Sequence, residues 1–389
     1  MPQQPEANDR LFTRPFLMLA IAELGYFLAE GAAIYALPLY VTGPVGSNQA
    51  GAGVAFGTFA IAALLVRPIA GRLADTRGRF PLLVFGASTT ALALVLTAQV
   101  ESLAAVILLR CLFGLGEAAF VVAGFAALAD LAPPSRLGEA LSYNSLSLYT
   151  GLAVGPLVAD LLADRWGLDV AWYAAAILAA GAVAATFGVG ETLRGDVHSG
   201  ARRLIHWPAV PAGLGFLASI IAISAFVAFA ALRAGDVELG NAGLPLFMYG
   251  ATVVVCRIAF AKVPDRLPSL PLGAASLTAM ACGLTVAAGW HTQIGLLCGA
   301  IIFGVGVAFS TPAFFSAMFA TAAPDQRGAA SATASILLDI GLGFGPLALG
   351  LVAESLGLSW TFGVGAGIAL VGTLWVLRLA RSQGRAPVT

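Results

Sequence analysis

Residues 151–157 read GLAVGPL, and residues 341–347, which lie 190 positions later, read GLGFGPL. Other residues and short motifs recur at the same offset without a gap. These pairs are Arg67 and Arg257, Asp75 and Asp265, Phe113-Gly114-x-Gly116 and Phe303-Gly304-x-Gly306, Pro134-x-x-x-Gly138-x-Ala140 and Pro324-x-x-x-Gly328-x-Ala330, and Gly167-Leu168 and Gly357-Leu358. A gapless register through several loops is difficult to obtain by chance. We therefore predict that the chain contains two copies of one structural unit.

The composition indicates that lipid surrounds most of the chain. Hydrophobic residues make up 59% of the 389 residues, and charged residues make up only 10%. The mean hydropathy is +0.91. A soluble protein of this length needs a more charged surface. A run of roughly 20 apolar residues is long enough to cross a bilayer as a helix, which satisfies its own backbone hydrogen bonds.

Twelve apolar stretches reach this length, six in each copy. They lie near residues 14–40, 52–71, 80–99, 103–130, 138–161, 169–190, 208–232, 242–261, 269–289, 294–321, 328–352 and 358–378. We predict an all-α integral membrane protein whose twelve transmembrane helices form two pseudo-symmetric six-helix bundles. The bundles are expected at residues 1–190 and 208–389, and a polar cytoplasmic connector is expected at 191–207.

Basic residues are unevenly distributed along the chain, although the formal net charge is zero. With the N-terminus in the cytoplasm, 17 of the 20 lysines and arginines fall on cytoplasmic segments or helix ends, as the positive-inside rule requires. This count includes Arg67 and Arg257, which we place at cytoplasmic helix ends. We expect a multi-pass protein of the inner or plasma membrane with both termini in the cytoplasm.

The predicted loop between the second and third helices carries a recognisable motif. Residues 71–79 read GRLADTRGR, which resembles the signature loop of the major facilitator superfamily, G-x-L-A-D-x-x-G-R. The resemblance implies a twelve-helix transporter in which this loop is a conformational switch. The loop residues concerned are Gly71, Asp75, Arg77, Gly78 and Arg79. The glycines allow a tight turn.

We expect the carboxylate of Asp75 to lie near the start of the eleventh helix, around Gly328. The backbone amides at a helix N-terminus favour a negative charge. The contact is expected only when the cytoplasmic side of the protein is closed.

Two further motifs resemble those of particular branches of the superfamily. Arg110-x-x-x-Gly114-x-Gly116-x-Ala118 is similar to the arginine motif of proton-driven members. Gly151-x-x-x-Gly155-Pro156 is similar to the antiporter motif of drug and metabolite exporters, but Ala159-Asp160 stands where two glycines are usual. The glycine-proline core recurs at Gly345-Pro346, and small residues also allow close helix packing. The motifs favour export over import.

Charged side chains inside the membrane are candidates for function, because burying a charge in hydrocarbon is costly. The candidates are Glu23, Glu30, Arg110, Glu117 and Asp339. Glu23 and Glu30 are seven residues apart, as are Arg110 and Glu117, so each pair lies on one face of its helix. The depths along the helices predict that Arg110 pairs with Glu30, alone or shared with Glu117.

The arrangement leaves two interpretations of these charges open. A carboxyl group without a cation can take up and release protons, and a cationic substrate would compete with the proton. Proton and substrate would then be exchanged across the membrane. Alternatively, Glu30 and Arg110 form a static salt bridge that fixes helix packing. Asp339 is either a second protonatable site or a buried polar group with a serine partner.

The repeat separates these charges from the shared scaffold. At the matching positions of the second copy stand Gly213, Ile220, Ala300, Val307 and, opposite Asp339, Tyr149. The backbone-shaping glycines are shared between the copies, whereas the buried charges are not. We therefore expect coupling chemistry mainly in the first half.

The substrate class is bounded by the residue types that the predicted spans lack. No glutamine lies in a predicted span interior, which argues against a sugar, and cations are too few for an anion or nucleotide. Aromatic side chains on the seventh and tenth helices suit an apolar or amphipathic solute, neutral or cationic. We expect a proton-coupled antiporter that exports such a small molecule. The alternatives are proton-coupled uptake of a metabolite and a membrane sensor that binds solute without moving it.

The sequence carries no pattern typical of an enzyme, a cofactor site or a metal site. The four cysteines lie in apolar helices without ligand-like spacing, so structural packing is expected. We predict no enzymatic activity, no cofactor and no metal. Protons, a small molecule and the lipid bilayer are the expected partners, with no nucleic acid, and the protein is expected to be a monomer.

Overall fold

The computed structural model describes residues 10–133, 136–193, 205–323 and 326–383, and these residues form helices and connecting loops. The helices are α1 (Arg14–Thr42), α2 (Gln49–Arg77), α3 (Arg79–Thr97), α4 (Leu103–Leu131), α5 (Leu137–Trp166), α6 (Leu168–Thr186), α7 (Val210–Asp236), α8 (Leu244–Ala259), α9 (Val263–Arg266), α10 (Ser269–Gly289), α11 (Gln293–Phe319), α12 (Arg327–Leu356) and α13 (Leu358–Gln383), with a 3₁₀ turn at Trp207–Ala209. Among the described residues, eleven helices are long and apolar enough to cross a membrane, and α8 is a shorter apolar helix. The predicted all-helical membrane fold is confirmed.

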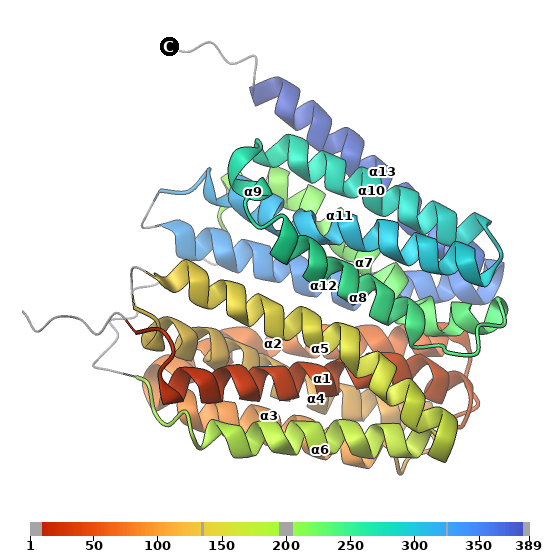
Figure 1. The fold of residues 1–389 in the computed structure, drawn as a ribbon, viewed down its shortest axis with the longest axis horizontal. Coiled ribbons are helices and arrows are strands. Elements are labelled where there is room, and N and C mark those ends of the chain that lie inside the picture. Colours follow the sequence, from red (N-terminus) through yellow and green to blue (C-terminus); the bar gives the residue numbers. More distant parts are fainter. Residues whose placement is uncertain (1–9, 134–135, 194–204, 324–325, 384–389) are drawn as a thin grey trace, which may run out of the picture.

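The helices form two halves that lie side by side (Figure 1). In the first half α1 packs on α5 and α6, and α4 packs on α2 and α3. In the second half α7 packs on α12 and α13, and α11 packs on α8 and α10. Most of the predicted connector at 191–207 lies outside the described residues, and the boundaries 1–190 and 208–389 stay a prediction.

The helices repeat at the offset seen in the sequence. α5 begins at Leu137 and ends at Trp166, and α12 begins and ends at the matching repeat positions, Arg327 and Leu356. α4 and α11 begin with equivalent caps, in which Ser102 and Thr292 accept a hydrogen bond from the backbone amide three residues later. Each cap satisfies an amide that has no partner within its helix. The two copies therefore share helix ends as well as helix order.

The shared glycines lie where helices cross at short distance. A Cβ on Gly114 of α4 would lie 2.2 Å from the carbonyl oxygen of Phe59 on α2. Its repeat mate, Gly304 of α11, would place a Cβ 2.8 Å from the carbonyl oxygen of Tyr249 on α8. Small residues allow such close approach between membrane helices, where apolar burial gives no driving force against lipid. The sequence repeat therefore preserves helix contacts.

The short helix α8 departs from the predicted span at 242–261. It has 16 residues, whereas α2, its repeat mate, has 29. α8 ends at Ala259, with Phe260 as its C-cap, and one further helical turn, α9, follows and contains Pro264. Proline has no N–H to donate to the carbonyl four residues earlier, here that of Phe260, and its ring clashes with that carbonyl; alanine occupies the equivalent position in α2.

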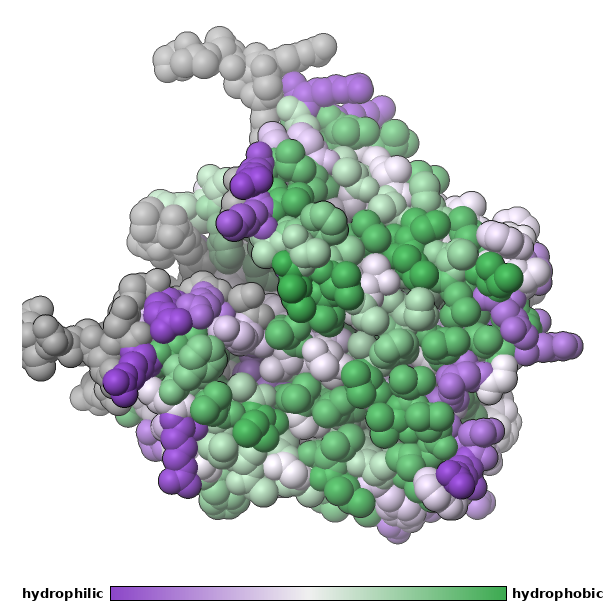
Figure 2. Space-filling view, viewed as in Figure 1, coloured by the Kyte–Doolittle hydropathy of each residue, from purple (hydrophilic) through white to green (hydrophobic). Residues whose placement is uncertain are grey.

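The outer surface matches a membrane environment. Figure 2 shows hydrophobic side chains across the middle of the molecule and hydrophilic ones toward its two ends. Large apolar side chains such as Leu65, Leu108 and Ile177 are exposed. We call the end that carries Arg14, Arg77 and Arg79 the arginine-rich end, and the opposite end the far end.

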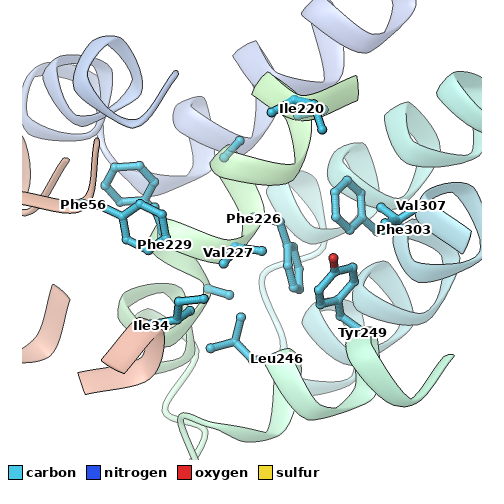
Figure 3. Close-up of a cluster of buried hydrophobic side chains, with 14 of the residues drawn as sticks. Ile34, Phe56, Ile220, Phe226, Val227, Phe229, Leu246, Tyr249, Phe303 and Val307 are labelled. Atoms are coloured by element: carbon cyan, nitrogen blue, oxygen red, sulfur yellow. The ribbon is translucent and has the colours of Figure 1, made fainter. Parts of the chain in front are cut away.

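The two halves are joined from the far end to about the middle of the helices. α2 packs on α12, α5 on α8 and α1 on α7, and a cluster that includes Ile34, Phe56, Phe229 and Leu246 fills the space between the halves (Figure 3). A hydrogen bond from the backbone amide of Gln49 to Glu354 also joins the halves at the far end. The structure therefore represents a state that is closed at the far end.

We predict that adding one methyl group at Gly57 opens the far end. A Cβ there would lie 2.0 Å from the carbonyl oxygen of Gly343, so α2 and α12 must separate in Gly57→Ala. Double electron–electron resonance between nitroxides at Pro44 and Ser355 should report a longer distance than in the parent. Gly181→Ala is the matched control, since nothing lies within 4 Å of that Cβ. Equal distances in the two variants would contradict the prediction.

Candidate functional site

Arg67 forms ion pairs with carboxylates from two other helices. Its Nη2 donates to Glu117 Oε1 of α4 at 3.0 Å and to Asp339 Oδ1 of α12 at 3.1 Å. Its Nε lies 2.7 Å from Asp339 Oδ2 as an ion pair, although those two atoms lack hydrogen-bond geometry. Glu117 belongs to the first half and Asp339 to the second, so Arg67 connects the halves by charge.

The position of Arg67 corrects the sequence-based expectation. We expected it at a cytoplasmic helix end, but α2 continues beyond it for several turns to Arg77. Asp339 is 1% exposed and Glu117 8% exposed, so Arg67 contacts carboxylates in the interior of the molecule. The signal that could have identified it is the apolar run on both sides, FAIAALLV before it and PIAG after it.

Arg110 does not form the predicted ion pair with Glu30. Its guanidinium lies over the rings of Phe113 at 4.5 Å and Phe59 at 4.8 Å, and its Nε donates to the carbonyl oxygen of Ala55 at 3.4 Å. Glu30 and Arg110 attract each other electrostatically, but no ion pair within 4.0 Å joins them in the described part of the chain. Cation–π contacts contribute about 2 kcal/mol each when desolvated, and they surround the charge in place of a carboxylate.

Glu30 is the carboxyl group of this region without an ion-pair partner in the described structure. It is partly accessible and interacts electrostatically with Glu117, Arg110 and Arg67. Together with Asp339, three carboxylates and two guanidiniums share one region, which leaves one negative charge if all are ionised. A proton or a cationic group would neutralise it.

Glu23 lies apart from that group, nearer the arginine-rich end of α1. It is 3% exposed and interacts with the side-chain amide of Asn144 on α5. A Cβ on Gly124 of α4 would lie 3.2 Å from Glu23 Oε1, so the carboxyl fills a space that the glycine leaves. The structure brings the other four candidates into one region and leaves Glu23 outside it.

Asp160 is a buried acid that the sequence analysis noted only as a departure from a motif. Its Oδ1 accepts a hydrogen bond from the Tyr35 hydroxyl of α1 at 2.6 Å. It also accepts hydrogen bonds from the backbone amides of Ala242 and Gly243, which precede α8. A carboxylate at the start of a helix satisfies amides that lack partners in the helix. Asp160 therefore ties the far end of α5 to the second half.

The helix 5 motif is a packing surface for α1. A Cβ on Gly151 would lie 2.4 Å from the backbone carbon of Phe27, and one on Gly155 would lie 2.5 Å from the carbonyl oxygen of Leu28. Pro156 contacts Gly31, whose Cβ would lie 3.0 Å from its Cδ. The motif brings α5 against α1, the helix that carries two of the candidate carboxylates.

The signature loop turns at one glycine. Gly71 lies inside α2 with no neighbour within 4 Å of a Cβ, whereas Gly78 adopts φ +102°, so the expected role of Gly71 in the turn is wrong. Arg79 is buried and contacts Asp75 at 3.3 Å and Asp130 at 3.1 Å. These contacts lie within the first half, and Arg77 is exposed. The expected contact of Asp75 with the start of α12, around Gly328, stays a prediction.

Glu191, which follows α6, caps the start of α3. Its carboxylate accepts hydrogen bonds from the backbone amides of Arg79 at 2.9 Å and Phe80 at 3.2 Å, and from those of Thr192 and Leu193. Partial burial acts to raise the pKa of Glu191, but these amides outweigh it and lower the pKa below 4.5. A Cβ on Gly78 would lie 2.1 Å from Glu191 Oε2, so the turn requires glycine for space as well as for φ.

The described residues contain no group of three or more His, Cys, Asp or Glu side chains placed to hold a metal ion. Cys111, Cys256, Cys282 and Cys298 are free thiols.

Comparison with known sequences gives a consistent family. The model of the Major Facilitator Superfamily matches residues 19–341. An uncharacterized MFS-type transporter of Salmonella typhimurium is 29% identical over 367 residues, which cover 92% of this chain and 94% of the relative. A similarly described protein of Burkholderia mallei is 29% identical over 383 residues, covering 92% and 91%.

Solved structures share the fold at low sequence identity. A mutant of the nucleoside transporter NupG gives a TM-score of 0.80 at 15% identity and covers 94% of this chain and 99% of that one. The peptide transporter POT in complex with sulfate gives 0.83 at 14% identity, with coverages of 99% and 97%. At this identity the likeness shows the fold alone.

We predict that Arg67→Gln destabilises the protein more than the loss of both partners of the Arg67–Asp339 pair. Removing one partner of a buried ion pair leaves an uncompensated charge and costs roughly 3–5 kcal/mol. The midpoint of thermal unfolding in detergent should fall in Arg67→Gln and recover in part in Arg67→Gln combined with Asp339→Asn, because Glu117 still lacks its cation there. An unchanged midpoint in the single variant would show that the pair carries no net stabilisation.

We predict that order around the signature loop depends on pH through Glu191. Because folding lowers its pKa, the stabilisation is present above the ordinary value of 4.5 and is lost as pH falls through the lowered value. Hydrogen-exchange protection of the Phe80 and Leu193 amides should fall in that acidic range. Glu191→Gln should remove the dependence, whereas the exposed Glu101→Gln should keep it. The same acid response in both variants would argue against the cap.

Proposed function

Since the chain belongs to the Major Facilitator Superfamily of membrane transporters, we propose that it exports a small amphipathic compound, neutral or cationic, in exchange for protons. Transport would occur by alternating access, in which the two halves rock about a site between them. In this proposal both termini and the arginine-rich end face the cytoplasm, the membrane is the inner or plasma membrane, and the monomer is the transporting unit.

The observation that carries the proposal is the charge balance around Arg67. Glu117 and Asp339 share Arg67, two phenylalanine rings surround Arg110, and Glu30 has no ion pair among the described residues. Removing a lone carboxylate from water is costly, so Glu30 gains from either a proton or a cationic group. A group that accepts either one, but not both, couples their movements in opposite directions.

The ion pair between the halves supplies a means of linking charge to conformation. Arg67 and Asp339 lie on α2 and α12, the same two helices that approach closely at Gly57 and Gly343. Opening the far end requires these helices to move apart. Protonation of Asp339 would weaken its attraction to Arg67 and so lower the cost of that movement. Which end of the protein is open would then depend on proton binding.

The order of events follows from which carboxyl group is accessible. In the state closed at the far end, Glu30 is partly accessible and Asp339 is buried. Glu30 would release its proton toward the arginine-rich end and accept substrate there. Asp339 would be protonated when the far end opens, where the proton concentration drives the cycle.

Flux in proteoliposomes tests the proposal. With the membrane potential clamped, an imposed pH gradient should drive radiolabelled tetraphenylphosphonium, an amphipathic cation, toward the acidic side. Glu30→Gln should abolish gradient-driven flux, because the amide cannot exchange a proton. Glu23→Gln and Glu117→Gln are measured beside it, and Glu101→Gln, exposed at the far end, is the control that should retain flux.

The direction of the flux, and whether flux occurs at all, separate the alternative functions. Accumulation with the proton gradient instead of against it would indicate a symporter, and binding without flux would indicate a sensor. Gradient-driven flux that survives in Glu30→Gln would refute the assignment of coupling to Glu30, and flux that survives in all three variants of Glu23, Glu30 and Glu117 would refute coupling by these carboxyl groups.

A further inference from the structure

Arg257 of α8 contacts Tyr149 of α5 across the boundary between the halves. Its Nη2 donates to the Tyr149 hydroxyl at 3.2 Å, and its guanidinium carbon lies 4.3 Å from the centre of the tyrosine ring. Tyr149 is 8% exposed, and Arg257 is partly accessible. The pair therefore lies between the halves with one side of the cation reachable.

This contact is the repeat mate of the Arg67–Asp339 ion pair. Arg257 occupies the position in the second copy that Arg67 occupies in the first, and Tyr149 occupies the position in the first copy that corresponds to Asp339. One contact joins α2 to α12 and the other joins α8 to α5. The arginine belongs to the first half in one contact and to the second half in the other, and its partner always comes from the opposite half. In one place the arginine meets a carboxylate, and in the other it meets a tyrosine.

The substitution leaves Arg257 short of an anion. No ion pair of Arg257 is present among the described residues, whereas Arg67 has two. The Nε of Arg257 is buried and has no hydrogen-bond partner, and the neighbouring Tyr249 is a buried phenol that supplies no negative charge. A desolvated guanidinium without an anion is unfavourable. The site is thus built for a carboxylate that the described residues do not supply there.

We propose that Arg257 and Tyr149 bind a carboxylate group of the transported solute. The guanidinium offers a planar fork that matches two carboxylate oxygens. The Tyr149 oxygen accepts from Arg257, so its own O–H proton is available to donate to the solute. This inference rests on the proposed transport function and narrows its substrate to a small amphipathic compound with one carboxylate, neutral overall when it also carries an amine.

The internal repeat supplies a direct way to occupy the site with the protein's own atoms. Tyr149→Asp introduces a carboxylate at the position equivalent to Asp339, next to Arg257. It should raise the thermal unfolding midpoint and remove binding of a carboxylate solute. Tyr149→Asn introduces a side chain of nearly the same shape as aspartate but without the charge. It should raise the unfolding midpoint less and weaken carboxylate binding less than Tyr149→Asp does.

Binding to the purified full chain in detergent tests the inference with a matched pair of probes. L-Phenylalanine and L-phenylalaninamide differ only in the carboxylate, and wild type should bind the acid about tenfold more tightly, since the fork contacts only the acid. Arg257→Gln should lose this preference, and Arg257→Lys should recover part of it. Chloride at equal ionic strength should not compete with the acid.

The outcomes separate this inference from the proposed function. Equal binding of both probes, binding of neither, an unchanged preference in Arg257→Gln, or full competition by chloride would each overturn the carboxylate site. Tetraphenylphosphonium carries no carboxylate, so its proton-driven flux in wild type does not depend on the proposed Arg257–Tyr149 site. If that flux fails while the probe preference is present, the transport proposal is wrong and the binding site remains.

Discussion

An arginine in the interior of a membrane protein must find compensation for its charge, and Arg67 finds it in two carboxylates from different helices. The cost of an uncompensated guanidinium fixes α2 against α4 and against α12 at the same depth. Because α12 belongs to the second half, this one requirement also connects the halves. The close approaches of the glycines on α2 and α12 then extend the contact to the far end.

The repeat gives the protein two equivalent boundaries between its halves, and the residues make them chemically different. The α2–α12 boundary contains an ion pair that a proton can weaken, whereas the α5–α8 boundary contains a cation over an aromatic ring. One close approach is shared, since a Cβ on Gly53 or on its repeat mate Gly243 would meet a proline carbonyl of the facing helix, that of Pro346 or Pro156. In the proposed cycle, proton binding acts at one boundary of this scaffold and solute binding acts at the other.

The helices and most of their ends could be predicted because each follows from local sequence. Apolar length predicted the spans, and the shared glycines marked the crossings at Gly114 and Gly304. The span at 242–261 was too long because the effect of Pro264 on α8 was not considered. Among the site residues, Arg67 was wrongly placed at a helix end. The sequence composition around an arginine near a helix end resembles that around an arginine inside a long apolar run. Asp160 was noted only as a departure from a motif. Its hydrogen bonds could not be predicted, because its amide partners lie in a loop of the other half.

The sequence by itself determined the membrane environment, the helix count of each copy, the repeat and the presence of unshared buried charges. These properties depend on composition and on periodicity along one helix. Only the tertiary structure decided which charges meet. Glu30 and Arg110 lie at matching depths, yet Arg110 turns to two phenylalanine rings, and Glu117 and Asp339 share Arg67. Pairing depends on the rotation of each helix about its axis and on its neighbours, and neither is contained in the spacing of residues along a single helix.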